Sequence, residues 1–193
     1  MAFDPEIHHR RSIRLQHYDY ALAGAYFVTI CAQNRACLFG AISEGQMQAN
    51  DHGKIVHECW EDLPNHYENV ILDEFVAMPN HVHGIIILTN NTVGAGFKPA
   101  LTGEPAPTID NHDIQSRNSS RHHGLPEIIR AFKTFSARRI NQARSTPGIP
   151  VWQRNYYEHV IRNEDDLNKI REYIITNPAG WEKDEENPDQ VRA

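Results

Sequence analysis

The spacing of apolar residues along the chain predicts a protein that mixes strands and helices. Runs of β-branched and aromatic residues mark the strands, whereas apolar residues recurring every three or four positions mark amphipathic helices. Asp51 and Asn163 stand where N-cap residues are preferred, and Pro126 suits the first turn of a helix. The predicted elements are a strand at 25–31, a hairpin within 36–50, a helix at 51–63, strands at 70–78 and 81–88, a helix at 126–142, a strand within 151–162 and a helix at 163–177.

Three segments lack this periodicity. Residues 1–20 are polar and basic and are interpreted as an N-terminal arm. Residues 90–124 are rich in Gly, Asn, Ser and Pro and are interpreted as a loop insertion, and residues 181–193 as an acidic tail. We therefore expect one domain at 21–180 to carry the chemistry, and a chain of 193 residues is long enough to build its own core.

Composition and cysteine usage exclude several classes of protein. Hydrophobic residues make up 40% of the chain, as in globular proteins, and no apolar run approaches the roughly 20 residues that cross a membrane. The chain shows no signal-peptide pattern, and its three cysteines form no CxxC pair. We therefore expect a cytoplasmic protein with no membrane contact, no disulfide framework and no thiolate zinc site.

The charge distribution indicates a nucleic-acid partner more clearly than the net charge of −6 does. Eight Lys and Arg residues lie between Arg117 and Arg154 against one acid, Glu127, while the acids collect near 164–166 and 182–189. A surface polarised in this way can hold a phosphate backbone on one side. Solvated helix faces are the alternative interpretation.

Two histidines at the start of a predicted strand form the first candidate site. His81 and His83 are two positions apart, so on a strand both side chains point to the same face while Val82 points to the other. Two neutral imidazoles on one face can chelate a divalent metal ion. Surface histidines on a strand would show the same spacing.

The last predicted helix carries the second candidate site. Tyr173 and Asn177 are four residues apart and lie together beside the apolar stripe of that helix. If the helix crosses the histidine strand, a metal, a phenol and an amide share one cleft, which suits attack of a tyrosine oxygen on a phosphate. A tyrosine at the border of the core is the alternative.

The order of four sequence blocks resembles the HUH single-tyrosine transposases, specifically the REP-associated tyrosine transposases. The resemblance runs from about residue 10 to 180, apart from the insertion. The matching blocks are GAYFVTI at 24–30, MPNHVHG at 78–84, WQRNYYEHVIR at 152–162 and YIITNP at 173–178.

The resemblance implies an α/β (α+β) fold, a ferredoxin-like or RRM-like sandwich with an antiparallel central sheet and helices on one face. It implies a transposase that cuts and transfers single-stranded DNA through a 5′-phosphotyrosine at Tyr173, with Mg²⁺ or Mn²⁺ bound by His81 and His83. Asn177 stands where many relatives carry a glutamine that completes the metal site. The implied partner is single-stranded or hairpin DNA, from palindromic repeats near the protein's own gene, and the protein would act as a monomer or homodimer.

By the same resemblance, a set of basic residues and one aromatic residue would contact DNA, the aromatic ring by stacking on unpaired bases. Tyr156 or Tyr157 as the nucleophile, and His159 as a third ligand or as a partner of Glu158, are alternatives. A non-catalytic nucleic-acid-binding module and a metal-dependent hydrolase are rival functions. The predicted DNA contacts are Arg10, Arg11, Arg14, Lys133, Arg138, Arg154 and Tyr156.

Overall fold

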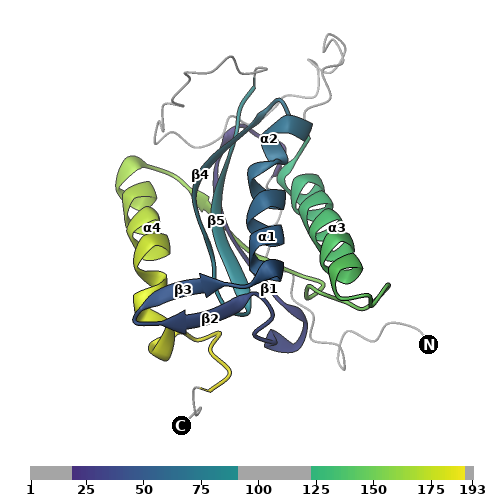
Figure 1. Cartoon of the computed structure of the whole chain (residues 1–193). Helices are drawn as coiled ribbons and strands as arrows, with labels where there is room; N and C mark the ends of the chain where they lie inside the picture. Colours follow the sequence, from purple (N-terminus) through teal and green to yellow (C-terminus); the bar gives the residue numbers. More distant parts are fainter. Residues whose placement is uncertain (1–18, 91–122, 190–193) are drawn as a thin grey trace, which may run out of the picture.

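The computed structural model describes residues 19–90 and 123–189. The predicted mixed fold is confirmed: a four-stranded antiparallel sheet in the order β4-β5-β1-β6 lies between helices (Figure 1). The elements of the sheet and its helices are β1 (Gly24–Cys31), α1 (Asp51–Glu61), α2 (Leu63–His66), β4 (Val70–Ala77), β5 (His81–Leu88), α3 (Leu125–Ala143), β6 (Tyr157–Ile161) and α4 (Glu164–Thr176).

Shorter elements complete the described chain. The predicted hairpin within 36–50 is confirmed as β2 (Gly40–Ser43) paired with β3 (Gln46–Ala49). Two 3-10 helices, η1 (Gln33–Arg35) and η2 (Asn177–Lys183), follow β1 and α4. The arm at 1–18 with its three arginines and residues 91–122 of the insertion lie outside the described residues. None of the described helices combines the length and the apolar content of a membrane span.

The helices cover both faces of the sheet, which corrects the expectation that they lie on one face. One core packs α1 and α3 against Val82 and Ile86, and a second packs α4 against Ile85 and Ile87. The reason lies in β5, all of which is buried. A strand with apolar side chains on both sides requires cover on both sides.

Asparagine caps fix the starts of two helices. The cap of α1 is Asn50, one residue before the predicted Asp51, and its Oδ1 accepts the Gly53 N–H at 3.0 Å. Asn163 caps α4 as predicted, accepting the Asp166 N–H at 2.8 Å. Each side chain satisfies a backbone donor that the first helical turn leaves without a partner.

The segment after η2 packs against the domain, in contrast to the tail expected from residue 181. Glu186 forms an ion pair with Arg35 at 2.8 Å, and its carbonyl oxygen accepts the Asn80 amide at 2.7 Å. Asn187 is buried, and its side chain donates to the Trp181 carbonyl oxygen at 3.0 Å. These contacts bring the acidic residues 184–186 to the start of β5, where the two histidines lie.

Gly84 lets α1 approach the sheet directly beside the histidine pair. A Cβ at this position would lie 2.4 Å from the Trp60 ring, which stacks on Phe75 at 4.7 Å. We expect Gly84→Ala to lower the free energy of unfolding by about 1–3 kcal/mol, because the buried Trp60 ring, which packs against Phe75 and Phe132, would have to shift. Chemical denaturation measures this change. Gly180→Ala is the matched control, because a Cβ there meets nothing within 4 Å, and equal losses in both variants would contradict the packing argument.

Candidate active site

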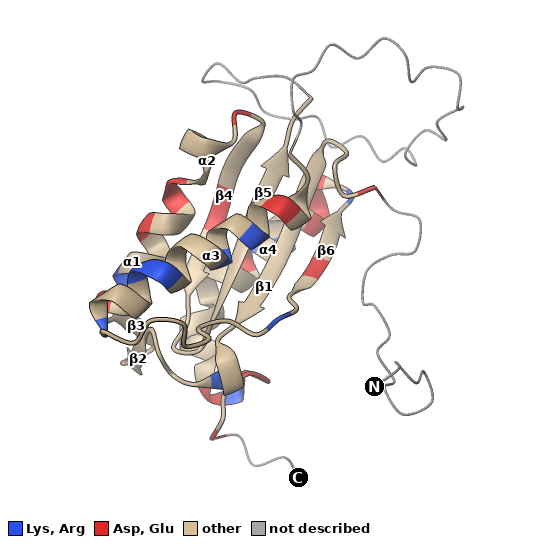
Figure 2. Ribbon diagram, turned by 90° about the vertical axis from the view of Figure 1, so that its right-hand side faces the viewer, with Lys and Arg blue, Asp and Glu red and all other residues tan. Residues whose placement is uncertain are grey.

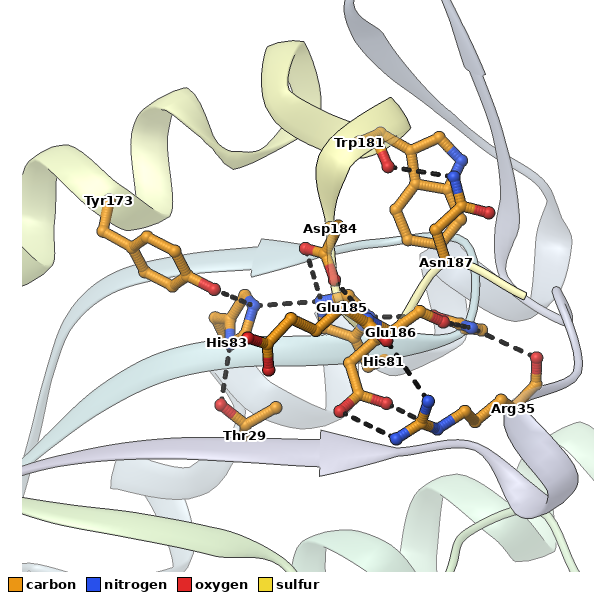
Figure 3. Close-up of polar contacts among 11 residues, drawn as sticks. Thr29, Arg35, His81, His83, Tyr173, Trp181, Asp184, Glu185, Glu186 and Asn187 are labelled. Atoms are coloured by element: carbon orange, nitrogen blue, oxygen red, sulfur yellow. Dashed lines mark hydrogen bonds and ion pairs between the residues drawn. The ribbon is translucent and has the colours of Figure 1, made fainter. Parts of the chain in front are cut away.

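His81 and His83 point to the same face of β5, as predicted, and face α4 and η2 rather than solvent. Their exposed fractions are 0% and 3%. Their Nε2 atoms lie 2.9 Å apart, with the ring centroids 4.5 Å apart (Figure 3). The pair is therefore a buried feature, and the interpretation as surface histidines is wrong.

Asn80 fixes the tautomer of His81. Its Nδ2 lies 3.1 Å from the Arg35 carbonyl oxygen and 2.7 Å from that of Glu186. Both oxygens only accept hydrogen bonds, so the amide nitrogen faces them and Asn80 Oδ1 faces His81 Nδ1 at 2.8 Å. His81 Nδ1 therefore carries the proton, and His81 Nε2 presents a lone pair to the interior of the site.

Thr29 holds the ring of His83 from the neighbouring strand. Its hydroxyl lies 2.8 Å from His83 Nδ1, and the two residues are paired across β1 and β5. A hydroxyl can donate or accept, so His83 can carry its proton on either nitrogen without turning its ring. In one tautomer His83 Nε2 donates to His81; in the other, both Nε2 atoms present lone pairs to a cation.

Tyr173 brings a phenol to this pair from α4. Its hydroxyl lies 3.3 Å from His83 Nε2 (Figure 3). Its ring meets Phe27 edge-on, with the centroids 6.0 Å apart. Tyr173 as a residue remains 47% exposed, so part of its side chain faces solvent, from which a substrate can approach. Helix α4 lies across the histidine strand, which is the arrangement that a shared cleft needs. Tyr173 therefore contacts the histidine pair in addition to packing at the border of the core.

Asp184 is the residue at this site that the sequence analysis missed. Its Oδ2 lies 3.9 Å from His81 Nε2, and the possible ligand atoms of His81, His83 and Asp184 all lie within 4.8 Å of one another. Asp184 follows η2, within residues 181–193, which the sequence indicated to be an acidic tail because they are acidic and lack periodicity. No local pattern marks its return to β5.

The arrangement of donors fits a divalent cation. His81 Nε2 carries a lone pair, and the Asp184 carboxylate that faces it carries no proton to donate. Two hydrogen-bond acceptors that face each other repel, and a cation bound between them would turn this repulsion into attraction. Asn177, one turn after Tyr173, is buried, and its Oδ1 has no hydrogen-bond partner among the described residues. Its predicted place as a ligand stays a prediction.

Burial keeps both histidines neutral, which is the form that binds metals. It lowers the pKa of His81 to about 4, and the Asp184 carboxylate offsets only part of this effect. Burial also lowers the pKa of His83 well below its usual value, and His81 adds to the shift. The pKa of the Tyr173 phenol is raised by burial and by Asp184, while a hydrogen bond with Asn177 acts in the opposite direction.

The alternatives for nucleophile and ligand lie further from the histidine pair. Tyr157 is on the same face, with its ring 6.3 Å from that of Phe27, whereas Tyr156 lines a pocket on the other face. His159 Nε2 lies 2.9 Å from Asp166 Oδ2, a contact that neither alternative for His159 named. Among these tyrosines, the described contacts give Tyr173 a hydroxyl within reach of His83.

The predicted DNA contacts within the described residues lie on the side of the sheet opposite α4. Arg138 is exposed on α3, and Arg154 is exposed on the segment before β6. Lys133 is partly buried and donates to the carbonyl oxygens of Gln153 and Arg154 at 2.6 and 2.9 Å. It therefore supports the Arg154 segment in addition to any contact with DNA.

Known proteins with related sequences and folds bear out the resemblance. No described protein-family profile matches the chain. A protein of Haemophilus influenzae that carries no functional name is 44% identical over 184 residues, which cover 95% of this chain and 96% of the relative. A second Haemophilus influenzae protein, provisionally named a REP-associated tyrosine transposase, is 25% identical over 165 residues. The match covers 83% of this chain and 73% of that relative.

A solved structure of a REP-associated tyrosine transposase bound to a REP hairpin has a similar fold. The TM-score is 0.51 at 16% identity, and the match covers 86% of this chain and 73% of that chain. The predicted resemblance to the REP-associated tyrosine transposases is thus confirmed. Within that class of fold, the chain belongs to the family of the 44% identical Haemophilus influenzae protein.

The buried histidines make stability depend on pH. In the unfolded chain both pKa values return to about 6.5, so below that pH the unfolded state binds more protons than the folded state. Without metal, we expect the free energy of unfolding to fall by up to about 1.4 kcal/mol per pH unit for each histidine between pH 6.5 and 4. Their contribution is constant above pH 6.5.

Denaturation at pH 7, 6 and 5 in EDTA measures this dependence. His81→Gln with His83→Gln should have a flatter profile than the wild type, because glutamine does not titrate. His57→Gln, which removes an exposed histidine of α1, should keep the wild-type slope. If the wild type, the double variant and His57→Gln all show the same dependence of unfolding free energy on pH, the two histidines are not buried in their neutral form.

Proposed function

We propose that this protein is a transposase that cuts single-stranded DNA beside repeat hairpins and rejoins it through a covalent bond to Tyr173. The observation that carries the proposal is the Tyr173 hydroxyl, 3.3 Å from a buried histidine pair that is suited to a metal ion. The relative named a REP-associated tyrosine transposase and the structural neighbour bound to a REP hairpin support the substrate class.

His81, His83 and Asp184 would hold the metal, with Asn177 as a candidate fourth ligand. Imidazole nitrogens combined with a carboxylate oxygen suit manganese, and magnesium is the alternative among hard cations. A divalent ion held by these residues would polarise the scissile phosphate and would offset the part of the rise in the Tyr173 pKa that comes from the nearby carboxylates. Asn80 and Thr29 hold the two imidazoles in place for this role.

The cleavage step exchanges one phosphodiester bond for another. The Tyr173 oxygen forms a bond to phosphorus as the bond from phosphorus to the 3′ oxygen breaks. The phenol loses its proton, the leaving 3′ oxygen gains one, and the 5′ phosphate remains on the tyrosine. Attack by a second 3′ hydroxyl reverses the step, so strand transfer needs no ATP.

The remaining features of the proposed function follow from the resemblance. The DNA would be the palindromic repeats near the protein's own gene, read as a hairpin with an adjacent single strand. The protein would act in the cytoplasm as a monomer or homodimer. The basic surface of α3 and the segment before β6 is the described part of the chain that suits a phosphate backbone.

The nucleophile is tested by trapping the covalent intermediate. We expect the wild type to form a protein–DNA adduct that survives a denaturing gel when it is incubated with Mn²⁺ and hairpin DNA from the flanking repeats. Mass mapping should place the adduct on Tyr173, and both Tyr173→Phe and His81→Ala should abolish it. Tyr157→Phe, which changes an exposed tyrosine on the same face, should retain it.

Other outcomes would assign a different activity. An adduct on Tyr157 would overturn the choice of nucleophile, and cleavage without any adduct would indicate a hydrolase. Hairpin binding without cleavage in Mn²⁺ or Mg²⁺ would favour a non-catalytic binding module.

The third metal ligand is tested by direct titration of the protein with Mn²⁺. We expect Asp184→Asn to weaken binding about tenfold or more, because it removes the one negative charge among the three proposed ligands, His81, His83 and Asp184, while the size of the side chain is kept. Glu185→Gln removes the neighbouring, exposed carboxylate and should change the Mn²⁺ affinity by less than about twofold. Isothermal calorimetry measures both.

A different ranking of variants would assign the third ligand elsewhere. If Asn177→Ala weakens Mn²⁺ binding and Asp184→Asn does not, the amide and not the carboxylate completes the site. Equal losses in Asp184→Asn and Glu185→Gln would indicate a general effect of negative charge.

A further inference from the structure

Helix α4 makes different contacts on its two flanks. Leu167, Ile170 and Ile174 form its apolar stripe, which packs on the sheet. At about 100° per residue, Arg171 and Tyr173 lie on opposite sides of this stripe. Tyr173 faces the histidine pair, whereas Arg171 faces β4, which runs beside α4 at the edge of the sheet (Figure 1). Any rotation of α4 about its axis therefore moves both side chains together.

Arg171 binds Asp73 of β4 through two parallel hydrogen bonds. Its Nε donates to Asp73 Oδ1 at 2.8 Å, and its Nη2 donates to Asp73 Oδ2 at 2.6 Å. A third bond, from Nη1 to Asn168 Oδ1 at 3.1 Å, braces the guanidinium against its own helix. The Arg171 and Asp73 side chains are 31% and 13% exposed, so the pair is largely shielded from water. Two bonds between planar groups fix direction as well as distance.

A β-bulge presents Asp73 to the helix. The register of β4 against β5 shifts between Leu72 and Phe75, and the two acids of β4, Asp73 and Glu74, lie between them. These acids form the red segment of β4 in Figure 2. A bulge can re-aim a side chain, and Asp73 Oδ1 also accepts the Glu74 N–H at 2.8 Å. Acids on an edge strand commonly face solvent and block pairing with other chains, whereas Asp73 is held by its own strand and by α4.

The apolar stripe of α4 does not by itself fix the rotation of the helix. Among the residues of α4, only Leu167 and Ile174 are buried. Hydrophobic attraction depends on the area buried and has no direction, so a small rotation changes it little. The Tyr173 oxygen lies at the end of a long side chain, and an error of about 1 Å in the position of a reacting group can cost about 100-fold in rate. The directional contact on the opposite flank supplies the missing restraint.

We propose, on the basis of the function proposed above, that the Arg171–Asp73 pair sets the rotation of α4 and thereby holds the Tyr173 oxygen at the histidine pair. Both are positioning residues, which act on the reaction through Tyr173 and not through contact with DNA or metal. The pair therefore controls the rate of the covalent step and leaves the affinities for DNA and metal unchanged.

The rate of adduct formation in a single turnover, with hairpin DNA and Mn²⁺ both saturating, tests this role. We expect Asp73→Asn to slow the reaction about 10- to 100-fold, because the amide keeps the size of the side chain but cannot accept both bonds. Arg171→Lys should slow it to a similar extent, because lysine keeps the charge but lacks the planar fork. Hairpin and Mn²⁺ affinities should stay within about twofold of the wild type in both variants.

Three further variants separate positioning from charge. Lys169→Gln removes an exposed cation of the same helix and should keep the wild-type rate. Glu164→Gln, which removes the carboxylate 3.9 Å from Arg171 Nη1, should keep it as well. Asp73→Asn combined with Arg171→Lys should lose no more than either single variant, because both changes break one interaction. Wild-type rates in the pair variants, losses that add, or a rate loss matched by a loss of hairpin affinity would overturn the proposal.

The position of Tyr173 is also measurable without the chemistry. The NMR shift of a fluorine label on its ring reports its contacts with Phe27 and His83, in EDTA and without DNA. We expect Asp73→Asn to move this signal toward its shift in the unfolded protein and Lys169→Gln to leave it in place. A second label on Tyr67, in the other core, should keep its folded shift and thereby show that the domain is intact.

The two measurements distinguish failure of the pair from failure of the proposed function. An adduct at Tyr173 together with an unmoved fluorine signal in Asp73→Asn would reject the pair and leave the function standing. A moved signal in Asp73→Asn without any adduct in the wild type would support the pair while rejecting covalent catalysis.

Discussion

The burial of β5 on both faces is the constraint on which the rest of the structure depends. A central strand with apolar side chains on each side needs helices on each side, and this requirement brings α4, with Tyr173, across the two histidines. The same burial removes water from the imidazoles and keeps them uncharged at neutral pH. Fold and site chemistry thus have one physical origin.

Buried polar groups are costly unless their hydrogen bonds are satisfied, and the Nδ1 atoms of His81 and His83 find their partners on separate elements. Thr29 comes from β1 and Asn80 from the turn before β5. Asn80 uses both amide hydrogens and its oxygen, so that one side chain connects His81, η1 and the chain after η2. Such fully used side chains hold ligands in fixed positions more firmly than packing alone.

Local signals in the sequence were sufficient for the strands and the helices, and for selecting His81, His83 and Tyr173 as candidates that the structure brings together. The spacing of His81 and His83 on a strand, and of Tyr173 and Asn177 on a helix, follows from backbone geometry that needs no knowledge of the fold. The apolar run after His83 also contained the reason for helices on both faces, because consecutive apolar residues of a strand point to opposite sides of the sheet.

Long-range contacts account for what the sequence did not reveal. Asp184 reaches the histidines because the chain turns back after η2, and no periodic pattern encodes that return. The support that Lys133 gives to the carbonyl oxygens of Gln153 and Arg154 is equally invisible in a sequence, where a lysine in a basic run indicates only charge.

The bond from Asn80 to the Glu186 carbonyl oxygen joins residues 106 positions apart. During synthesis on the ribosome, three of the four strands, β1, β4 and β5, and both histidines are made well before this partner leaves the exit tunnel. Asp184, which is the third member of the group, and the bond that anchors its segment therefore reach the histidines after these strands. A nascent chain holds an incomplete cluster until its final turn has docked, and the order of synthesis itself delays assembly of the site until the domain is whole.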